Sequence, residues 1–182
     1  MRVLRAADRA ATPWKNGGGV TREVAAWPPG ADLDAFDWRV SLADVAADGP
    51  FSAFPGVDRV LTLIAGDGLA LEIEGRTVRL EPGAPFAFPG EAAVAARLAA
   101  GPIRDLNVMV RRGAWTARVA PWRGDPGAAS DGPTLVVLLE DVEDLAQLDV
   151  VLIDAGETVT LDIPAETRAL TIALHRAQPT VR

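Results

Sequence analysis

Short apolar runs separated by glycine- and proline-rich turns recur along almost the whole chain. This alternation of runs and turns constrains the fold more than any other feature. The runs have the length of ordinary strands, and several alternate apolar with polar residues. They lie at 20–27, 36–43, 57–64, 69–73, 77–80 and 106–111, and again at 135–139, 150–153, 158–163 and 170–174. No strand–helix alternation of the Rossmann kind is visible. This pattern predicts an all-β sandwich or barrel.

One segment is ambiguous between helix and strand. Residues 91–100 are rich in alanine, which favours a helix. Val94, Ala96 and Leu98 alternate with other residues, however, and the segment is short and bounded by turns. We expect a strand there.

Composition excludes several classes of function. The chain has 182 residues and a net charge of −7, so it lacks the basic surface of a nucleic-acid or membrane binder. Because it has no cysteine, disulfides, thiolate zinc sites and cysteine nucleophiles are excluded. The only histidine, His175, cannot form a multi-histidine metal site within one chain, and we expect it at the surface. We therefore expect no metal and no cofactor.

No targeting segment or membrane-spanning apolar run is visible, so we expect a cytoplasmic protein. The stretch 122–133, which is rich in glycine, proline and aspartate, is the best linker. It divides the chain into a larger unit, 1–125, and a smaller one, 126–182.

The strongest local candidate for a binding site is a glycine-rich loop that contains the only lysine among 18 basic residues. Three glycines can direct successive amide N–H groups toward an anion, to which a lysine and an asparagine would add charge and hydrogen bonds. The alternative is a tight turn with a solvated lysine. The loop consists of Trp14, Lys15, Asn16, Gly17, Gly18 and Gly19.

Polar residues on the predicted strands provide further candidates. Arg39 and Ser41 share one face of their strand, opposite Trp38, Val40 and Leu42, and a guanidinium in a barrel interior would bind a carboxylate through two hydrogen bonds. Glu23 is a candidate ion-pair partner of Arg39 or Lys15. A structural ion pair at the surface is the alternative for these charges.

Two more candidates lie on later strands. Asn107 shares a face with Asp105, Met109 and Arg111, and this mixture fits a cavity wall better than a solvated surface. Arg59 begins a strand, where it would pair with Asp58, Asp48 or a ligand.

Longer segments of the sequence resemble known protein families. Residues 75–90 have the succession of strands and Pro-Gly turns that is typical of the second cupin motif. Glu91 and Ala92 follow where metal-binding cupins have a histidine. Four ordered blocks resemble the HutD/Ves family: residues 13–23 (PWKNGGGVTRE), 36–43 (FDWRVSLA), 48–59 (DGPFSAFPGVDR) and 105–109 (DLNVM). The resemblance is dense over residues 1–125 and loose beyond.

The resemblance implies a two-part (bicupin) protein with a cupin-like, jelly-roll type β-barrel, in which residues 126–182 form a smaller half packed on the first. Family members are associated with histidine-utilisation enzymes and are suspected of binding a small metabolite. No established reaction comes with the family.

We therefore expect a metal-free cupin-like protein that binds a small anionic metabolite, a carboxylate, as a regulatory or buffering factor in histidine utilisation. A homodimer is compatible with the sequence. One alternative is a metal-independent isomerase or lyase, with Glu23 or Asp105 as the base and Lys15 as an electrostatic stabiliser. The other is a structural interaction module whose barrel is filled by side chains.

Overall fold

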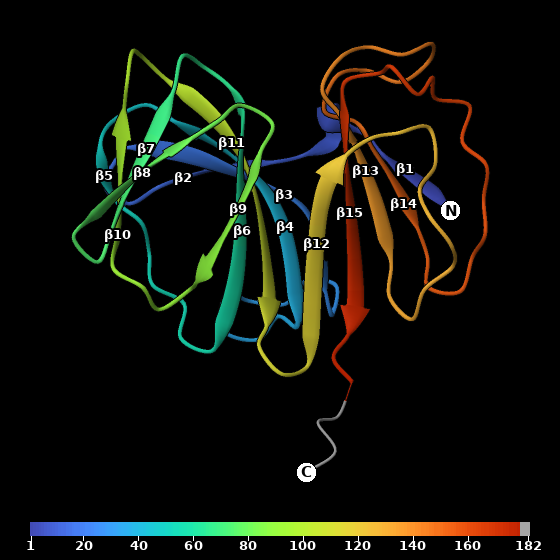
Figure 1. The fold of residues 1–182 in the computed structure, drawn as a ribbon, viewed down its shortest axis with the longest axis horizontal. Helices are drawn as coiled ribbons and strands as arrows, with labels where there is room; N and C mark the ends of the chain where they lie inside the picture. Colours follow the sequence, from blue (N-terminus) through green and yellow to red (C-terminus); the bar gives the residue numbers. More distant parts are fainter. Residues whose placement is uncertain (179–182) are drawn as a thin grey trace. The chain divides into compact units, whose positions relative to one another are not determined.

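The computed structural model describes residues 1–178, in which antiparallel strands make three sheets (Figure 1). The chain forms two compact units: Ala10–Arg112, and Met1–Arg9 together with the chain from Gly113 onward. The helical structure of the described part is one 3-10 turn, η1 (Ala6–Asp8), so no helix there is long enough to cross a membrane.

The unit Ala10–Arg112 contains two sheets whose strands pair in a nested order. β4 pairs with β11, β5 with β10, β6 with β9 and β7 with β8, which is the wrapped pairing of a jelly roll. The six-stranded sheet has the order β2 (Ala11–Pro13), β3 (Gly19–Trp27), β4 (Trp38–Val45), β11 (Ile103–Arg111), β6 (Val57–Ala65), β9 (Pro85–Pro89). The four-stranded sheet has the order β5 (Gly49–Pro50), β10 (Val94–Leu98), β7 (Leu69–Ile73), β8 (Arg76–Leu80).

Alternating apolar residues explain why these two sheets pack together. Leu61 and Leu63 of β6 and Leu71 of β7 are fully buried in one core, since side chains two residues apart point to the same face of a strand. The all-β prediction is confirmed. So is the strand expected within 91–100, because β10 occupies it and Ala96 is buried in the same core.

The other unit has one five-stranded sheet. Its order is β1 (Arg2–Leu4), β14 (Val150–Ile153), β13 (Thr134–Leu138), β15 (Ala169–Arg176), β12 (Trp115–Pro121). Read across this sheet from β12, the order is β12, β15, β13, β14, which are the first, fourth, second and third of these strands in the chain. Read from β4, the jelly-roll strands β4, β11, β6 and β9 follow the same order.

Two features differ from the sequence-based expectations. The second unit begins at Gly113 rather than near residue 126, because β12 pairs with β15 along its whole length and β1 joins the same sheet through β14. Residues 158–163 form no strand. Ile163 is nevertheless buried. Alternation correctly indicated which side chain is buried, but no neighbouring strand offers its backbone there.

Candidate functional site

The inner face of the six-stranded sheet of the jelly roll carries a row of polar residues. Pairing aligns Glu23, Ser41 and Asn107 across β3, β4 and β11. It aligns Arg39 with Arg59 on either side of Met109. Paired residues share a face, and Leu61, the partner of Asn107 on β6, belongs to the core between the sheets. The structure therefore brings together five of the residues singled out in the sequence: Glu23, Arg39, Ser41, Arg59 and Asn107.

Arg39 and Glu23 form an ion pair at the accessible side of this row. The Arg39 Nε donates to Glu23 Oε2 at 2.8 Å, and its Nη1 lies 3.4 Å from Ser41 Oγ. The Arg39 side chain is 13% exposed and that of Glu23 is 42% exposed. Because Glu23 pairs with Arg39 rather than with Lys15, much of the charge of Arg39 is already compensated.

Arg59 is a buried cation with no ion-pair partner among the described residues. It is 6% exposed, its Nε donates to Asn107 Oδ1 at 3.3 Å, and its Nη1 donates to the Ser52 carbonyl at 3.2 Å. The carboxylates considered as partners are engaged elsewhere: Asp58 pairs with Arg112, and Asp48 with Arg97. Burial lowers the pKa of Arg59 to about 10, and the negative charge of Asp105 partly opposes this shift.

Three aromatic rings surround the Arg59 guanidinium. Its central carbon lies 5.4 Å from the ring centroid of Phe51, 5.5 Å from that of Phe54 and 5.0 Å from that of Phe88. Cation–π contacts of this kind stabilise a guanidinium that has lost its water. They leave its hydrogen-bonding edge available, and Nη2 has no acceptor among the described residues.

Asp105 is a buried carboxyl on the same face, two residues before Asn107. It is 2% exposed, and no described residue donates a hydrogen bond to its side chain. Burial raises the pKa of Asp105 to about 7; the positive charge of Arg59 opposes the rise, and the negative charge of Asp44 adds to it. From the sequence, Asp105 is expected on the mixed face with Asn107 and, in one alternative function, as a base. An acidic residue within a largely apolar strand is the sequence feature that points to its burial.

The glycine-rich loop is a tight turn. The Gly17 amide donates to the Trp14 carbonyl at 3.0 Å, and the Gly18 amide donates to Asn16 Oδ1 at 3.0 Å. Gly17 has a φ of +72°, which favours glycine. Two of the three amides expected to face an anion thus donate within the loop, while the Lys15 and Asn16 side chains lie at the surface.

This turn positions Trp14 beside the candidate site. The Trp14 Nε1 donates to Thr21 Oγ1 at 2.7 Å, and its ring meets Phe51 edge-on, with centroids 6.5 Å apart. Gly19 allows this approach, because a Cβ there would lie 2.6 Å from the Asp44 carbonyl oxygen and 3.1 Å from the Trp14 ring. Through Phe51 the tryptophan reaches the aromatic surroundings of Arg59.

The donor set of this face does not fit the transition metal that many cupins hold. Two guanidinium cations occupy it and no imidazole is present, whereas such metals prefer histidine with a carboxylate. His175 lies in the other unit, where its Nδ1 is 3.4 Å from Asp131 Oδ1 and its side chain is 42% exposed. Within residues 1–178 no group of three or more histidine, aspartate or glutamate side chains lies together as a metal site would need.

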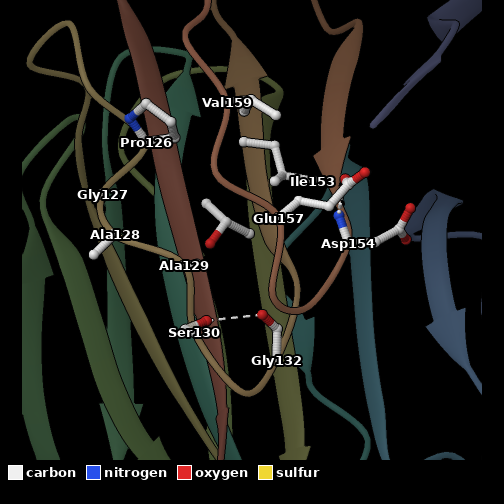
Figure 2. Close-up of a pocket in the computed structure, with 11 residues that line it drawn as sticks. Pro126, Gly127, Ala128, Ala129, Ser130, Gly132, Ile153, Asp154, Glu157 and Val159 are labelled. Atoms are coloured by element: carbon white, nitrogen blue, oxygen red, sulfur yellow. Dashed lines mark hydrogen bonds between the residues drawn. The ribbon is translucent and has the colours of Figure 1, made fainter.

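The unit with the five-stranded sheet contains a small hollow beside the loop 126–132 (Figure 2). Its volume of about 10 Å³ has room for roughly one water molecule, far below the size of a metabolite site. Ser130 Oγ donates to the Gly132 carbonyl at 2.8 Å, and Glu157 accepts a hydrogen bond from the N-terminal amine at 2.6 Å. Its polar groups are thus engaged in holding the loop and the chain terminus.

Comparisons with known proteins agree with the fold and identify the family. The HutD family model matches residues 6–173. An uncharacterised 21.2 kDa protein in the hutC 3' region of Pseudomonas putida is 39% identical over 138 residues, 75% of this chain and 72% of that protein. Protein Ves of Citrobacter koseri is 45% identical over 108 residues, 58% of this chain and 56% of that protein. The structure of HutD from Pseudomonas fluorescens SBW25 superposes with a TM-score of 0.80 at 35% identity and covers 96% of this chain and 98% of that one. The chain therefore belongs to the HutD family.

Proposed function

We propose that the inner face of the jelly roll binds a small anionic metabolite, a carboxylate, and that Arg59 is its principal cation. The protein would act as a regulatory or buffering factor in histidine utilisation. One observation carries the proposal: a guanidinium that is 6% exposed has no carboxylate partner among the described residues. Burying a charge without a partner costs free energy, which a bound anion would recover.

The contacts of Arg59 suit a carboxylate ligand. Nε and Nη1 are held by Asn107 and Ser52, and Nη2 has no acceptor among the described residues. Charge-assisted hydrogen bonds from guanidinium to carboxylate are about twice as strong as neutral ones. Because Asn107 accepts from Arg59 through Oδ1, its amide protons remain available for an oxygen of the ligand.

The other candidate residues would have supporting roles. Arg39, compensated by Glu23, and Ser41 would provide weaker polar contacts at the accessible side. Trp14, fixed by the turn of Gly17, Gly18 and Gly19, would close one wall through Phe51. Lys15 and Asn16 would act at longer range, by attracting anions toward this side of the unit.

The strand order supports a two-part, bicupin origin. The sheet of β12 to β15 has the same order as β4, β11, β6 and β9 of the jelly roll. We infer that the second unit is a reduced jelly roll, in which the segments 122–133, 139–149 and 154–168 stand where a second sheet would be. We therefore propose the complete jelly roll as the ligand-binding unit.

A second candidate function is a metal-independent isomerase or lyase. The observation that favours it is Asp105, because a buried carboxyl with a pKa near 7 has the properties of a general acid or base. The binding protein and the enzyme share the same ligand face, and they differ in turnover. Incubation with histidine-pathway carboxylates, followed by NMR of the small molecules, distinguishes them.

Calorimetric titration with a panel of small carboxylates, including formate and acetate, tests the binding proposal. Arg59→Lys keeps the charge and removes the planar fork, so we expect binding to weaken by at least about tenfold. Arg97→Lys is the matched control, since Arg97 is an exposed arginine that pairs with Glu72 and Asp48. Equal binding by wild type and Arg59→Lys would contradict the assignment.

A further inference from the structure

Asp105 and Arg59 are two buried charges on one face that form no ion pair with each other. We propose that anion binding at Arg59 is coupled to the uptake of one proton by the carboxylate of Asp105. This inference rests on the proposed function, and it states how the same site responds to pH.

The charges around Asp105 balance before a ligand binds. Arg39 is compensated by Glu23 in a pair, and Arg59 is balanced at longer range by ionised Asp105. On the opposite face of β4, Asp44 is held by Arg22 and by Arg104, whose Nε lies 2.5 Å from Asp44 Oδ1. A monoanion on Arg59 would leave the buried face with an uncompensated negative charge.

The remaining surroundings of Asp105 cannot compensate this charge. Its partners across the sheet are Ala43 and Leu63, which belong to the apolar core between the two sheets. The facing strands β7, β8 and β10 contribute apolar residues to that core: Leu69, Leu71, Leu80, Val94 and Ala96. Glu72, Arg79 and Arg97 lie on the other face of the four-stranded sheet. Arg76 pairs with Ile73 at the first position of β8 and is exposed. A proton on Asp105 is therefore the group that restores neutrality at this buried position.

Protonation also changes the hydrogen-bonding ability of Asp105. An ionised carboxyl only accepts hydrogen bonds, whereas a protonated one also donates through its O–H. The balanced step is protein plus anion plus one proton from solvent giving the complex, with the proton bonded to a carboxylate oxygen of Asp105. By reciprocity, anion binding must raise the pKa of Asp105 by the same free energy that protonation adds to anion binding.

Calorimetric titration of the full chain with sodium formate, in buffers of different ionisation enthalpy, measures this coupling. Near pH 8, where Asp105 is largely ionised, we expect uptake of about one proton per formate bound; near pH 5.5 we expect uptake close to zero. Affinity should fall about tenfold per pH unit above about pH 7. Carbon-13 NMR of the Asp105 carboxyl should show its titration moving to higher pH as formate is added.

Two variants separate this inference from the proposed function. Asp105→Asn should bind formate without proton uptake and with affinity independent of pH between about 6 and 9. The control Glu72→Gln changes an exposed carboxylate that pairs with Arg97 on the other face of the four-stranded sheet, and it should keep the uptake. Formate binding with the same enthalpy in every buffer near pH 8, or an Asp105 carboxyl signal that formate does not move, would overturn the proton coupling alone. The absence of both formate and acetate binding from about pH 5 to 9 would overturn the proposed function and the coupling with it.

Discussion

Asp105→Asn should remove a pH-dependent loss of stability that the native chain carries. The carboxyl is 2% exposed, and burial holds its pKa at about 7 instead of 3.8. Because the folded state binds this proton more tightly than the unfolded state, Asp105 contributes stability that is fully present below about pH 3.8. This contribution is lost as pH rises through about 7. Each pKa unit corresponds to about 1.36 kcal/mol, so the loss amounts to about 4 kcal/mol.

Urea unfolding of the wild type and of Asp105→Asn, measured between about pH 4.5 and 8.5, tests this expectation. The asparagine carries a constant cost for burying an amide, so the informative quantity is how the difference in free energy of unfolding changes with pH. Carboxyls with lowered pKa values that do not interact with Asp105, such as Asp149 and Glu140, titrate in both proteins and cancel in this difference. The free energy of unfolding of the variant, relative to that of the wild type, should rise with pH up to about 7 and stay constant above it. A difference that stays flat within about 0.5 kcal/mol across the range would refute a buried, ionisable Asp105.

Three further expectations follow from the packing and the loop. Gly19→Ala should destabilise the protein by about 1–3 kcal/mol, because its Cβ would lie 2.6 Å from the Asp44 carbonyl oxygen. Gly18→Ala, whose Cβ would meet nothing closer than 3.4 Å, should change the urea midpoint much less, and equal midpoints would contradict the close packing. Leu71→Ala should cost about 2–5 kcal/mol, since Leu71 is fully buried between the two sheets; a loss below about 1 kcal/mol in urea would contradict that core. Lys15→Ala should weaken formate binding less than about threefold, because the lysine is exposed; a loss of tenfold or more would restore the glycine loop as the anion site.

Alternation along single strands accounts for most of what the sequence predicted. It placed Arg39 with Ser41, and Asp105 with Asn107, on common faces, and the structure confirms both arrangements. Alternation does not predict which strands lie next to each other in the sheet. β4 and β11 are neighbours although more than fifty residues separate them, and Arg59 meets Asn107 through a third strand. Registers of this kind depend on packing between distant segments, so the burial of Arg59 without a carboxylate could not be derived from local pattern.

The glycine loop shows a second limit of local reasoning. Three successive glycines beside a lysine permit either an anion-binding concavity or a tight turn, and the two have the same sequence. The Gly17 amide bonded to the Trp14 carbonyl and the Gly18 amide bonded to Asn16 Oδ1 favour the turn. The limited room beside Gly19 explains a glycine that backbone angles alone would not require. The unit boundary at Gly113 was missed for a similar reason, since β12 pairs with β15, which lies far along the chain.

The central claim is that Arg59 is the cation that receives a small carboxylate, and the location of a bound anion tests it most directly. A crystal structure of the full chain grown with formate, compared with one grown without it, provides that location. We predict formate on the inner face of the jelly roll, accepting hydrogen bonds from the Arg59 guanidinium and lying beside Asn107 and Asp105. Formate bound only at the Lys15 loop or at exposed arginines, with the edge of Arg59 covered by protein atoms, would contradict the claim.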